Sequence, residues 1–516
     1  MHLSWCLILL HSLCVYSVPQ TGDGMAATVN SNLSPQRPLS VLMTVSFFPG
    51  HLFVVMALGE ELVKRGHNVT LVTTEMKGSR LLPGLPESVG IHFVSAGYSS
   101  LTKQTYEQRM KQLGDLSMDL HTFYEYFDEI TSPIIQIGKK VDEIGSEKFD
   151  MIVAEISTYA LVPYFARKSK VLVVSTLLPP LQAASPPWPL ASFETDNLTF
   201  YDRLWEPFLV VMVRILYWAM FKAVIRDNHF RNEIDQMDLH IPGIKVPLLI
   251  STVIGFEYPR TITPLTHYVG PVLMSHSPPL DPELQQWLDT KPDQSVIYIS
   301  MGTSATLSPE AAMALIGGIN VTSFYAVWSL RPGNQYILDG IELDKSRFYI
   351  SDWVPQQSLL KHRSISMAIL HCGMNGVHEA LYNGVPIITA PYAMDQFENA
   401  ARVCHAGVGV ELTKYLNQNF SSQQVEEAIV AIDTQGCREK AQKMRRLFLE
   451  AGCTQTAADL VEYYEAVGWE HLVPAYAKYN WSWIQYYNVD VYVILATVII
   501  VFLLCMYKLL MFCLQP

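Results

Sequence analysis

The sequence predicts an α/β protein with two doubly wound parallel-sheet domains that face a central crevice, followed by a C-terminal transmembrane helix. In each half of the chain, short apolar runs alternate with stretches of helical periodicity. A chain of 516 residues is too long for one core and suits two large domains. Open sheets of this kind bind ligands at the carboxyl ends of their strands, so we expect the functional site between the domains.

The first domain is expected over residues 38–250. Its opening follows a strand, helix, strand order, which starts a parallel sheet with right-handed crossovers. The segments are a strand in 38–48 (PLSVLMTVSFF), a helix in 51–66 that ends at a glycine, and strands at 68–75, 151–155 (MIVAE) and 171–176 (VLVVST). Residues 204–226 are apolar but carry Arg214 and Lys222, which favours an amphipathic helix at a membrane face or an apolar pocket.

The second domain is expected over residues 293–440. Prolines recur between Pro242 and Pro292, and we place a linker at 251–292. Strands and helices then alternate from the buried strand SVIYIS at 295–300 to a helix at about 396–404. Residues 441–488 are expected to form helices that pack back onto the first domain.

The two ends of the chain predict a secretory route. The apolar run in residues 1–18 is typical of a signal peptide. Residues 489–510 are expected to span the membrane, because Val491 to Tyr507 carry no charge, the apolar run resumes after Lys508, and an aromatic belt precedes them. We expect a single-pass type I membrane protein, with the catalytic part in the lumen and residues 511–516 as a short cytosolic tail. Six Asn-x-Ser/Thr sequons fit a glycoprotein of the endoplasmic reticulum, or of another secretory-pathway membrane.

Composition and cysteine spacing exclude some functions. The net charge is −12 and no basic tract occurs, so no nucleic-acid partner is expected. Cys372, Cys404, Cys437 and Cys453 lack CxxC spacing and indicate no zinc site, while a Cys437–Cys453 pairing stays open. No GxGxxG motif follows a predicted strand, which disfavours a dehydrogenase.

A strand-to-helix turn in the second half is suited to an anion. The strand MAIL ends at Leu370, His371 to Met374 make the turn, and Asn375 is expected to cap a helix that starts at Gly376. The helix end presents unpaired N–H groups, while Gly373 and Gly376 allow close backbone approach. His371 can donate to a phosphate, and Glu379, one turn further, can accept from two ribose hydroxyls.

Other side chains near this turn suit the remaining parts of a nucleotide sugar. Trp353 offers a flat surface for a pyrimidine, with the Gln356 amide beside it. Asp395 and Gln396 offer an acceptor and an amide for vicinal sugar hydroxyls, and Thr303 and Ser304 offer hydroxyl and N–H groups to a phosphate. The set as a whole predicts a site for a nucleotide sugar.

His51 and Glu155 are the candidate catalytic pair of the first half. His51 opens a helix after Pro49 and Gly50, and we expect the helix N-terminus to keep its ring neutral and basic. Glu155, at the end of MIVAE, is the carboxylate expected to fix its tautomer.

With these residues in view, the chain resembles the membrane-anchored UDP-glycosyltransferases of animals, of the UDP-glucuronosyltransferase type. The resemblance runs from about Pro38 to Tyr507 and is most specific from Trp353 to Gln396. It implies the GT-B fold of two Rossmann-like domains, inversion at the anomeric carbon, and no cofactor or metal ion. It assigns His51 as the base. It also assigns His371, Asn375 and Gly376 to phosphate, Glu379 to ribose, Trp353 and Gln356 to the base, and Asp395 and Gln396 to the sugar.

Two features depart from that family. Glu155 stands where the family usually has aspartate, and the tail KLLMFCLQP carries one lysine where a lysine-rich retention signal is usual. The function expected is transfer of a hexosyl group, glucuronosyl first, from a UDP-sugar to the hydroxyl of a small lipophilic acceptor. The alternatives are a UDP-glucose-dependent enzyme or a catalytically silent protein that binds UDP-sugars or lipids. Membrane lipid is a further expected partner, and a homo-oligomer stays open.

Overall fold

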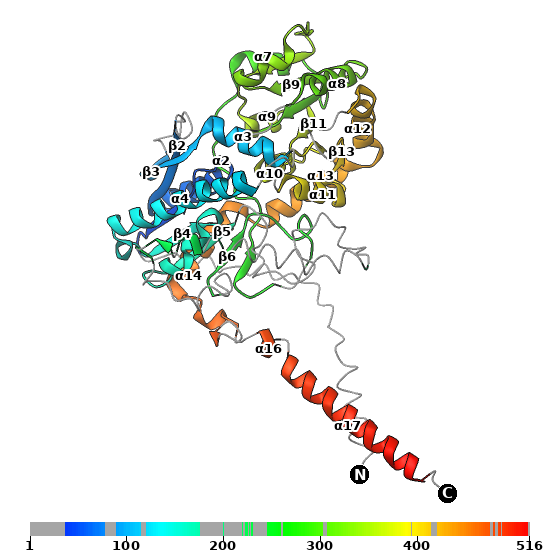
Figure 1. Cartoon of the computed structure of the whole chain (residues 1–516). Helices are drawn as coiled ribbons and strands as arrows, with labels where there is room; N and C mark the ends of the chain where they lie inside the picture. The colour runs from blue at the N-terminus through cyan, green and yellow to red at the C-terminus, as the bar shows by residue number, and fades with distance from the viewer. Residues whose placement is uncertain are drawn as a thin grey trace. The chain divides into compact units, whose positions relative to one another are not determined.

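The computed structural model describes residues 37–77, 89–114, 120–175, 200, 219, 222–224, 226–227, 229–230, 245–259, 262–302, 307–393, 395–413, 420–474, 478–479, 483–486 and 488–513 (Figure 1). The predicted signal peptide, most of the amphipathic segment 204–226, and both Thr303 and Ser304 lie outside these residues.

The first domain contains a seven-stranded parallel sheet with the order β3-β2-β1-β4-β5-β6-β7. β1 and β4 are central and almost wholly buried, and this double-sided burial accounts for their continuous runs of Val, Ile, Leu and Met. The strands are β1 (Ser40–Val45), β2 (Asn68–Lys77), β3 (His92–Thr102), β4 (Met151–Glu155), β5 (Val171–Ser175), β6 (Leu248–Ile250) and β7 (Thr266–Tyr268).

Helices cover this sheet. α2 packs against β1 and β2, and α4 packs against β2 and β3. The α-helices are α2 (Pro49–Lys64), α3 (Lys103–Gly114), α4 (Leu120–Ile144) and α5 (Val162–Phe165), and the 3₁₀ turns are η2 (Ser146–Lys148) and η3 (Ile156–Leu161).

The proline-rich segment 251–292 differs from the linker that the sequence predicts. β7 lies within it and extends the first sheet beyond residue 250, and α7 (Pro282–Asp289) follows. β6 and β7 are the last two strands at one edge of the first sheet. Proline is tolerated near short edge strands, because fewer of their backbone N–H groups are needed for pairing.

The second domain contains a six-stranded parallel sheet with the order β10-β9-β8-β11-β12-β13. Two parallel sheets of this type confirm the predicted fold class. The strands are β8 (Val296–Ser300), β9 (Tyr325–Ser329), β10 (Phe348–Ser351), β11 (Ile365–Leu370), β12 (Ile387–Thr389) and β13 (Gly409–Glu411). The helices are α8 (Pro309–Asn320), η8 (Pro332–Leu338), α9 (Gln356–Leu360), α10 (Met374–Tyr382), α11 (Gln396–His405), α12 (Ser422–Thr434) and α13 (Cys437–Glu450).

Each sheet has a point where the strand order reverses. In the first sheet, the chain leaves β1 outward through β2 and β3, then returns to place β4 on the other side of β1. In the second sheet, β8 and β11 stand in the same relation. The loops that leave two such neighbouring strands diverge, which opens a crevice at their carboxyl ends. His51 and Glu155 follow the first pair of strands, and His371 follows the second.

The C-terminal helices divide between the two domains. α12 and α13 pack on the second domain, against α8, α10 and β13, whereas α14 (Cys453–Val467) packs on α2 of the first. We expected residues 441–488 to pack back onto the first domain, and within this region α14 is the helix that does so. η9 (Glu470–Leu472) and α16 (Trp483–Tyr486) follow it.

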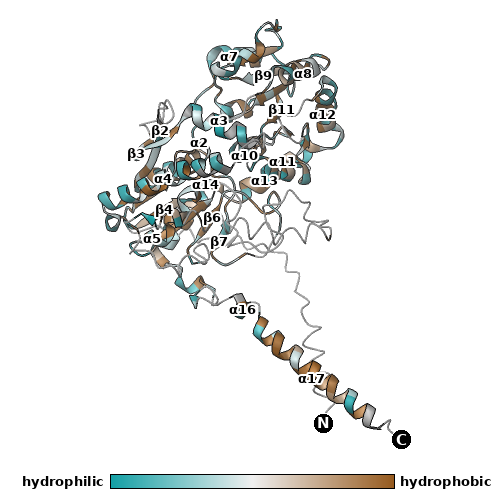
Figure 2. Cartoon of the chain, viewed as in Figure 1, coloured by the Kyte–Doolittle hydropathy of each residue, from teal (hydrophilic) through white to brown (hydrophobic). Residues whose placement is uncertain are grey.

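The last helix, α17 (Val489–Cys513), is apolar along most of its length (Figure 2). Within Val489–Leu510, a window of 18 residues has a mean hydropathy of 2.7, and none of that window is buried against the rest of the chain. At about 1.5 Å per residue, 22 residues span about 33 Å, which is enough for a bilayer core. Length and composition thus match the predicted transmembrane segment.

Candidate active site

His51 and Glu155 form a hydrogen-bonded pair at the reversal point of the first sheet. His51 lies in the first turn of α2, and Glu155 is the last residue of β4, the neighbour of β1. The distance from His51 Nδ1 to Glu155 Oε1 is 2.7 Å, and the other carboxylate oxygen accepts from the Ser157 backbone N–H at 2.7 Å. The Glu155 side chain is fully buried and that of His51 is 20% exposed. The carboxylate is therefore rigid, and only the imidazole reaches solvent.

This pairing decides the chemistry of the ring. An ionised carboxylate only accepts hydrogen bonds, so Nδ1 carries the proton and Nε2 is the nitrogen with a lone pair. Burial acts to lower the pKa of His51, but the charge and hydrogen bond of Glu155, with the charge of Asp395, outweigh it and raise the pKa. The helix N-terminus was expected to keep this ring neutral. The Glu155 carboxylate is a full charge bonded to the ring at 2.7 Å, whereas a helix end carries about half a charge.

His371 occupies a strained turn after β11. Cys372, the next residue, is buried with a φ of +63°, a conformation that costs a non-glycine residue energy. A Cβ at Gly302 would lie 2.3 Å from the His371 ring and one at Gly373 would lie 2.7 Å from it, so both positions need glycine. Burial lowers the pKa of His371 to about 4. The ring is therefore neutral at pH 7 and can donate one N–H.

Asn375 does not cap α10, contrary to the sequence prediction. The helix begins at Met374 with Gly373 as its N-cap, and Gly373 has no side chain to satisfy the first-turn N–H groups. Asn375 therefore lies in the first turn, where its Nδ2 donates to the Gly50 carbonyl at 2.6 Å. This bond joins the helix end that the sequence predicts to bind an anion to the turn that carries His51.

A chain of amides and a phenol holds Glu379. The Tyr298 hydroxyl donates to Gln356 Oε1 at 2.9 Å, the Gln356 amide donates to Glu379, and Gln357 donates to the other carboxylate oxygen at 3.3 Å. Burial raises the pKa of Glu379 to about 7, against the opposing effect of the two amides. Trp353 is 66% exposed and leaves its ring face open to a ligand. Of this group, the sequence analysis missed Tyr298, which sits inside a uniformly apolar strand.

Asp395 and Gln396 lie at the start of α11 but differ in their surroundings. Gln396 Oε1 accepts from the backbone N–H groups of Tyr392 and Ala393 at 2.9 and 3.1 Å, so this oxygen holds the preceding loop. Asn399 donates to Asp395 Oδ2 at 2.8 Å and to the Cys372 carbonyl at 3.0 Å, which ties Asp395 to the His371 turn. Sequence reasoning missed Asn399, although its i+4 spacing from Asp395 was the available signal.

A buried ion pair continues along α11 behind Asp395. Arg402 Nε donates to Glu257 Oε2 at 2.9 Å, with both side chains 1% exposed, and its Nη1 lies 3.7 Å from Glu398 Oε2. Burial raises the pKa of Glu398 to about 7, with Arg402 opposing and Asp395 and Glu257 adding to the rise. The one guanidinium of this group is thus committed to carboxylates of the protein. Within the described ranges, no group of three or more His, Cys, Asp or Glu side chains could hold a metal ion.

The site combines residues from both domains. The Asn375–Gly50 bond and the electrostatic contact of Asp395 with His51 bring His371, Asn375, Gly376 and Asp395 to the side of α2 that bears the His51–Glu155 pair. Trp353, Gln356 and Glu379 lie on the second domain, with Gln356 next to Gly376. Thr303 and Ser304 lie outside the described residues. Cys437 and Cys453 are free thiols.

Comparison with known proteins bears on this arrangement. The family described as "UDP-glucoronosyl and UDP-glucosyl transferase" matches residues 40–516. The chain is 24% identical to UDP-glucuronosyltransferase 1A8 of Rattus norvegicus, over 90% of each chain. It is 23% identical to 2-hydroxyacylsphingosine 1-beta-galactosyltransferase of Mus musculus, over 79% of this chain and 76% of that one. The solved structure of CalG4, the calicheamicin glycosyltransferase, aligns with a TM-score of 0.58 at 19% identity, over 84% of this chain and 99% of that one, and shows the same fold.

Proposed function

Because this chain belongs to the family of UDP-glucuronosyl and UDP-glucosyl transferases, and is therefore a UDP-glycosyltransferase, we propose that it transfers a hexosyl group to a hydroxyl with inversion and with His51 as general base. The observation that carries the proposal is the 2.7 Å bond from His51 Nδ1 to a fully buried Glu155, in a ring whose Nε2 is the remaining proton acceptor. A base oriented in this way by a carboxylate is the arrangement that activates a hydroxyl nucleophile.

The proposed step is a single displacement. His51 Nε2 takes the proton of the acceptor hydroxyl while its oxygen forms a bond to the anomeric carbon. The bond from that carbon to the UDP oxygen breaks on the opposite face, and UDP leaves with the electron pair. Glu155 stabilises the imidazolium that forms. The first-turn N–H groups of α10 and the neutral His371 ring are the donors suited to the negative charge on the leaving diphosphate.

The donor sugar expected from the sequence is glucuronate, with glucose as the alternative. The charges around Asp395 support the alternative. A uronate carboxylate in this place would lie next to the Asp395 carboxyl, and the guanidinium of Arg402, which could offset its charge, is already bound to Glu257. Like charges in a buried site raise the cost of binding, whereas neutral hydroxyls donate to carboxylates. We therefore propose a neutral hexose as donor sugar ahead of glucuronate.

The surroundings of His51 support a lipophilic acceptor. The Phe48 ring lies 5.6 Å from the His51 ring and 6.3 Å from the ring of Tyr106, which comes from α3. Phe47 packs on Phe48 at 4.4 Å and is buried. An aromatic wall beside the base stabilises an apolar or planar acceptor by burial and ring packing. We propose a phenol or a small lipophilic alcohol.

Further parts of the proposal concern the membrane anchor, the topology and the metal dependence of the reaction. The apolar helix α17 supports a membrane anchor. A type I orientation in the endoplasmic reticulum, with a cleaved signal peptide and N-glycans, is our proposed topology. A metal-independent reaction is also proposed, and unchanged turnover in excess EDTA is the expected result.

The decisive experiment uses the detergent-solubilised full chain. UDP-glucose, UDP-galactose and UDP-glucuronate, each radiolabelled, are supplied with a mixed pool of phenols and sterols, and product is measured together with UDP affinity. We expect transfer from a neutral donor, and we expect His51→Ala to abolish it while UDP still binds. Sustained transfer by His51→Ala removes the base from the mechanism. UDP binding with no product from any donor in the wild-type chain would instead favour a silent binding protein.

A further inference from the structure

The helix that carries His51 is held at its far end by α14, a helix from the opposite end of the chain. α2 is 16 residues long, so about 24 Å separate its two ends. Its N-terminal turn bears His51 and accepts the Asn375 bond, and its last turn contacts α14. Most of the side chains between these ends are buried, which leaves the helix little freedom to bend.

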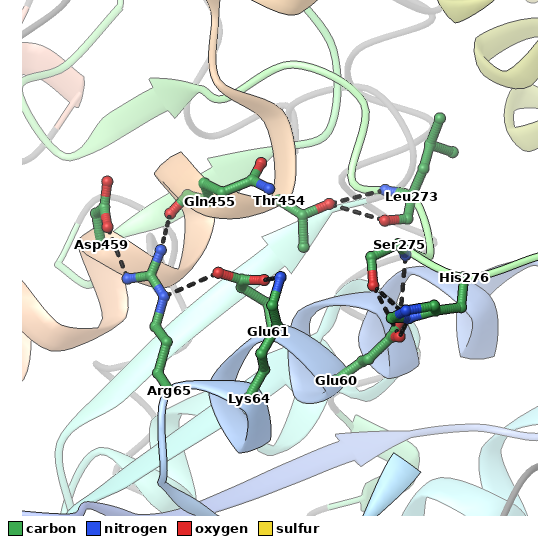
Figure 3. A network of polar contacts seen from close by, with 10 residues as sticks. All are labelled: Glu60, Glu61, Lys64, Arg65, Leu273, Ser275, His276, Thr454, Gln455 and Asp459. Atoms are coloured by element: carbon green, nitrogen blue, oxygen red, sulfur yellow. Dashed lines mark hydrogen bonds and ion pairs between the residues drawn. The ribbon is translucent and has the colours of Figure 1, made fainter. Parts of the chain in front are cut away.

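Arg65, the C-cap of α2, makes four hydrogen bonds here, and Figure 3 shows those to Glu61, Asp459 and Gln455. Its guanidinium donates to Asp459 at 2.6 Å, to Glu462 at 3.1 Å and to the Gln455 carbonyl at 3.1 Å, all on α14, and to Glu61 at 3.0 Å on α2 itself. One cation thus bridges carboxylates of two helices. Without it, Glu61 would face Asp459 and Glu462 as like charges, and α14 would be repelled from α2.

Further bonds fix α2 from the same side. His67 accepts the Leu39 backbone N–H at Nδ1, so its Nε2 carries the proton that it donates to Glu462 at 2.8 Å. On α2, Glu60 accepts from the Ser275 backbone N–H at 3.1 Å and hydroxyl at 2.8 Å (Figure 3). These contacts hold the axial position and the rotation of α2 at its C-terminal end.

We propose that Arg65 is a positioning residue for His51: by joining α14 to α2, it sets where the first turn of α2 stands against Glu155 and the second domain. The inference rests on the proposed role of His51 as base. Displacement of a catalytic group by about 1 Å costs about a hundredfold in rate, so loss of the α14 contact is expected to lower kcat by about ten- to a hundredfold. Residues that bind UDP lie on the second domain, so donor affinity is expected to stay within about twofold.

The test compares Arg65→Ala with a matched arginine elsewhere. Arg438 also bridges a carboxylate and a neighbouring strand with three bonds, to Asp433 and Ser366, and is buried to a similar degree. We expect Arg65→Ala to lower kcat and to move the ascending limb of its pH profile, because the contact of His51 with Glu155 changes. Arg438→Ala is expected to keep both, and Arg65→Lys to recover part of the rate.

Two further measurements keep the outcome unambiguous. Circular dichroism and UDP affinity show whether each variant is folded, and Asp459→Asn, a milder change at a half-exposed carboxylate, is expected to lower kcat in the same direction by a smaller factor. A folded Arg65→Ala with wild-type kcat and pH profile overturns the inference. So does a loss that Arg438→Ala reproduces. If instead His51→Ala is active, the proposed base itself fails, and the two failures are thereby distinguished.

Discussion

Replacing Glu155 by glutamine tests the core of the proposed mechanism. At an effective dielectric constant of about 20, unit charges 2.7 Å apart attract by about 6 kcal/mol. A glutamine amide retains a hydrogen bond to His51 but lacks the carboxylate charge. If the glutamine NH₂ donates to Nδ1 of His51, the ring proton moves to Nε2, which is the nitrogen that must accept the proton of the acceptor hydroxyl. A loss of about 4–6 kcal/mol corresponds to a fall in kcat of about 10³- to 10⁴-fold, at about 1.36 kcal/mol per factor of ten.

The same substitution changes the pH dependence in a defined direction. His51 must be neutral to accept a proton, so the rate rises as pH rises through its pKa. Glu155 contributes to raising that pKa above the usual 6.5, so the ascending limb of the wild-type profile lies above 6.5. In Glu155→Gln the carboxylate charge no longer opposes the effect of burial, so the pKa of His51 falls. The ascending limb of the pH profile therefore moves to lower pH.

The assay is kcat against pH for one phenol acceptor, with UDP affinity measured in parallel. Glu155→Asp is the matched control, because it keeps the charge and remains a good N-cap for η3. It should retain activity within about tenfold. A Glu155→Gln enzyme with kcat within tenfold of wild type and an unshifted limb would refute the reasoning.

Three further predictions concern the second domain. Gly302→Ala places a Cβ 2.3 Å from the His371 ring at a φ of +65°, so we expect a destabilisation of about 1–3 kcal/mol and weaker UDP binding by calorimetry; unchanged affinity would contradict the close approach. Trp353→Ala removes an exposed ring, so UDP binding should weaken by about 1–3 kcal/mol while the thermal midpoint stays the same, and equal affinities would exclude stacking. Arg402→Met leaves the Glu257 carboxylate buried without its cation, so the free energy of unfolding should fall by about 3–5 kcal/mol in thermal unfolding. Adding Glu257→Leu should restore much of this stability. If stability does not return, the loss is one of packing and not of charge.

Much of the fold could be predicted from the sequence because its signals are local. Buried strands such as Val296–Ser300 are continuous apolar runs, and their alternation with helical patterns predicts parallel sheets. The His371 turn was recognisable for a similar reason, since a strand end, two glycines and a helix start occur within seven residues. The exact start of α10 was not, because Gly373 and Asn375 are both acceptable N-caps, and the strained Cys372 turn decides between them.

Short strands and side-chain chemistry were harder to foresee. β7 has three residues among prolines, too few to give a periodic pattern, and pairs with β6 because the sheet edge is open to it. The direction of the pKa shift of His51 was also beyond the sequence, because it depends on how far the 2.7 Å bond to Glu155 and the charge of Asp395 offset the burial of the ring.

By itself, the sequence determined the two series of strands, the residues available for a nucleotide sugar and the apolar helix at the C-terminus. Those properties follow from hydrophobic spacing and side-chain type over short stretches of chain. Only the tertiary structure decided which other groups meet: Gly50 with Asn375 across 325 positions, and Arg65 with Asp459 across 394. Such contacts depend on how whole domains and helices pack, and no local pattern carries that information. The direction of the pKa shift of His51 and the position of α2 depend on such contacts.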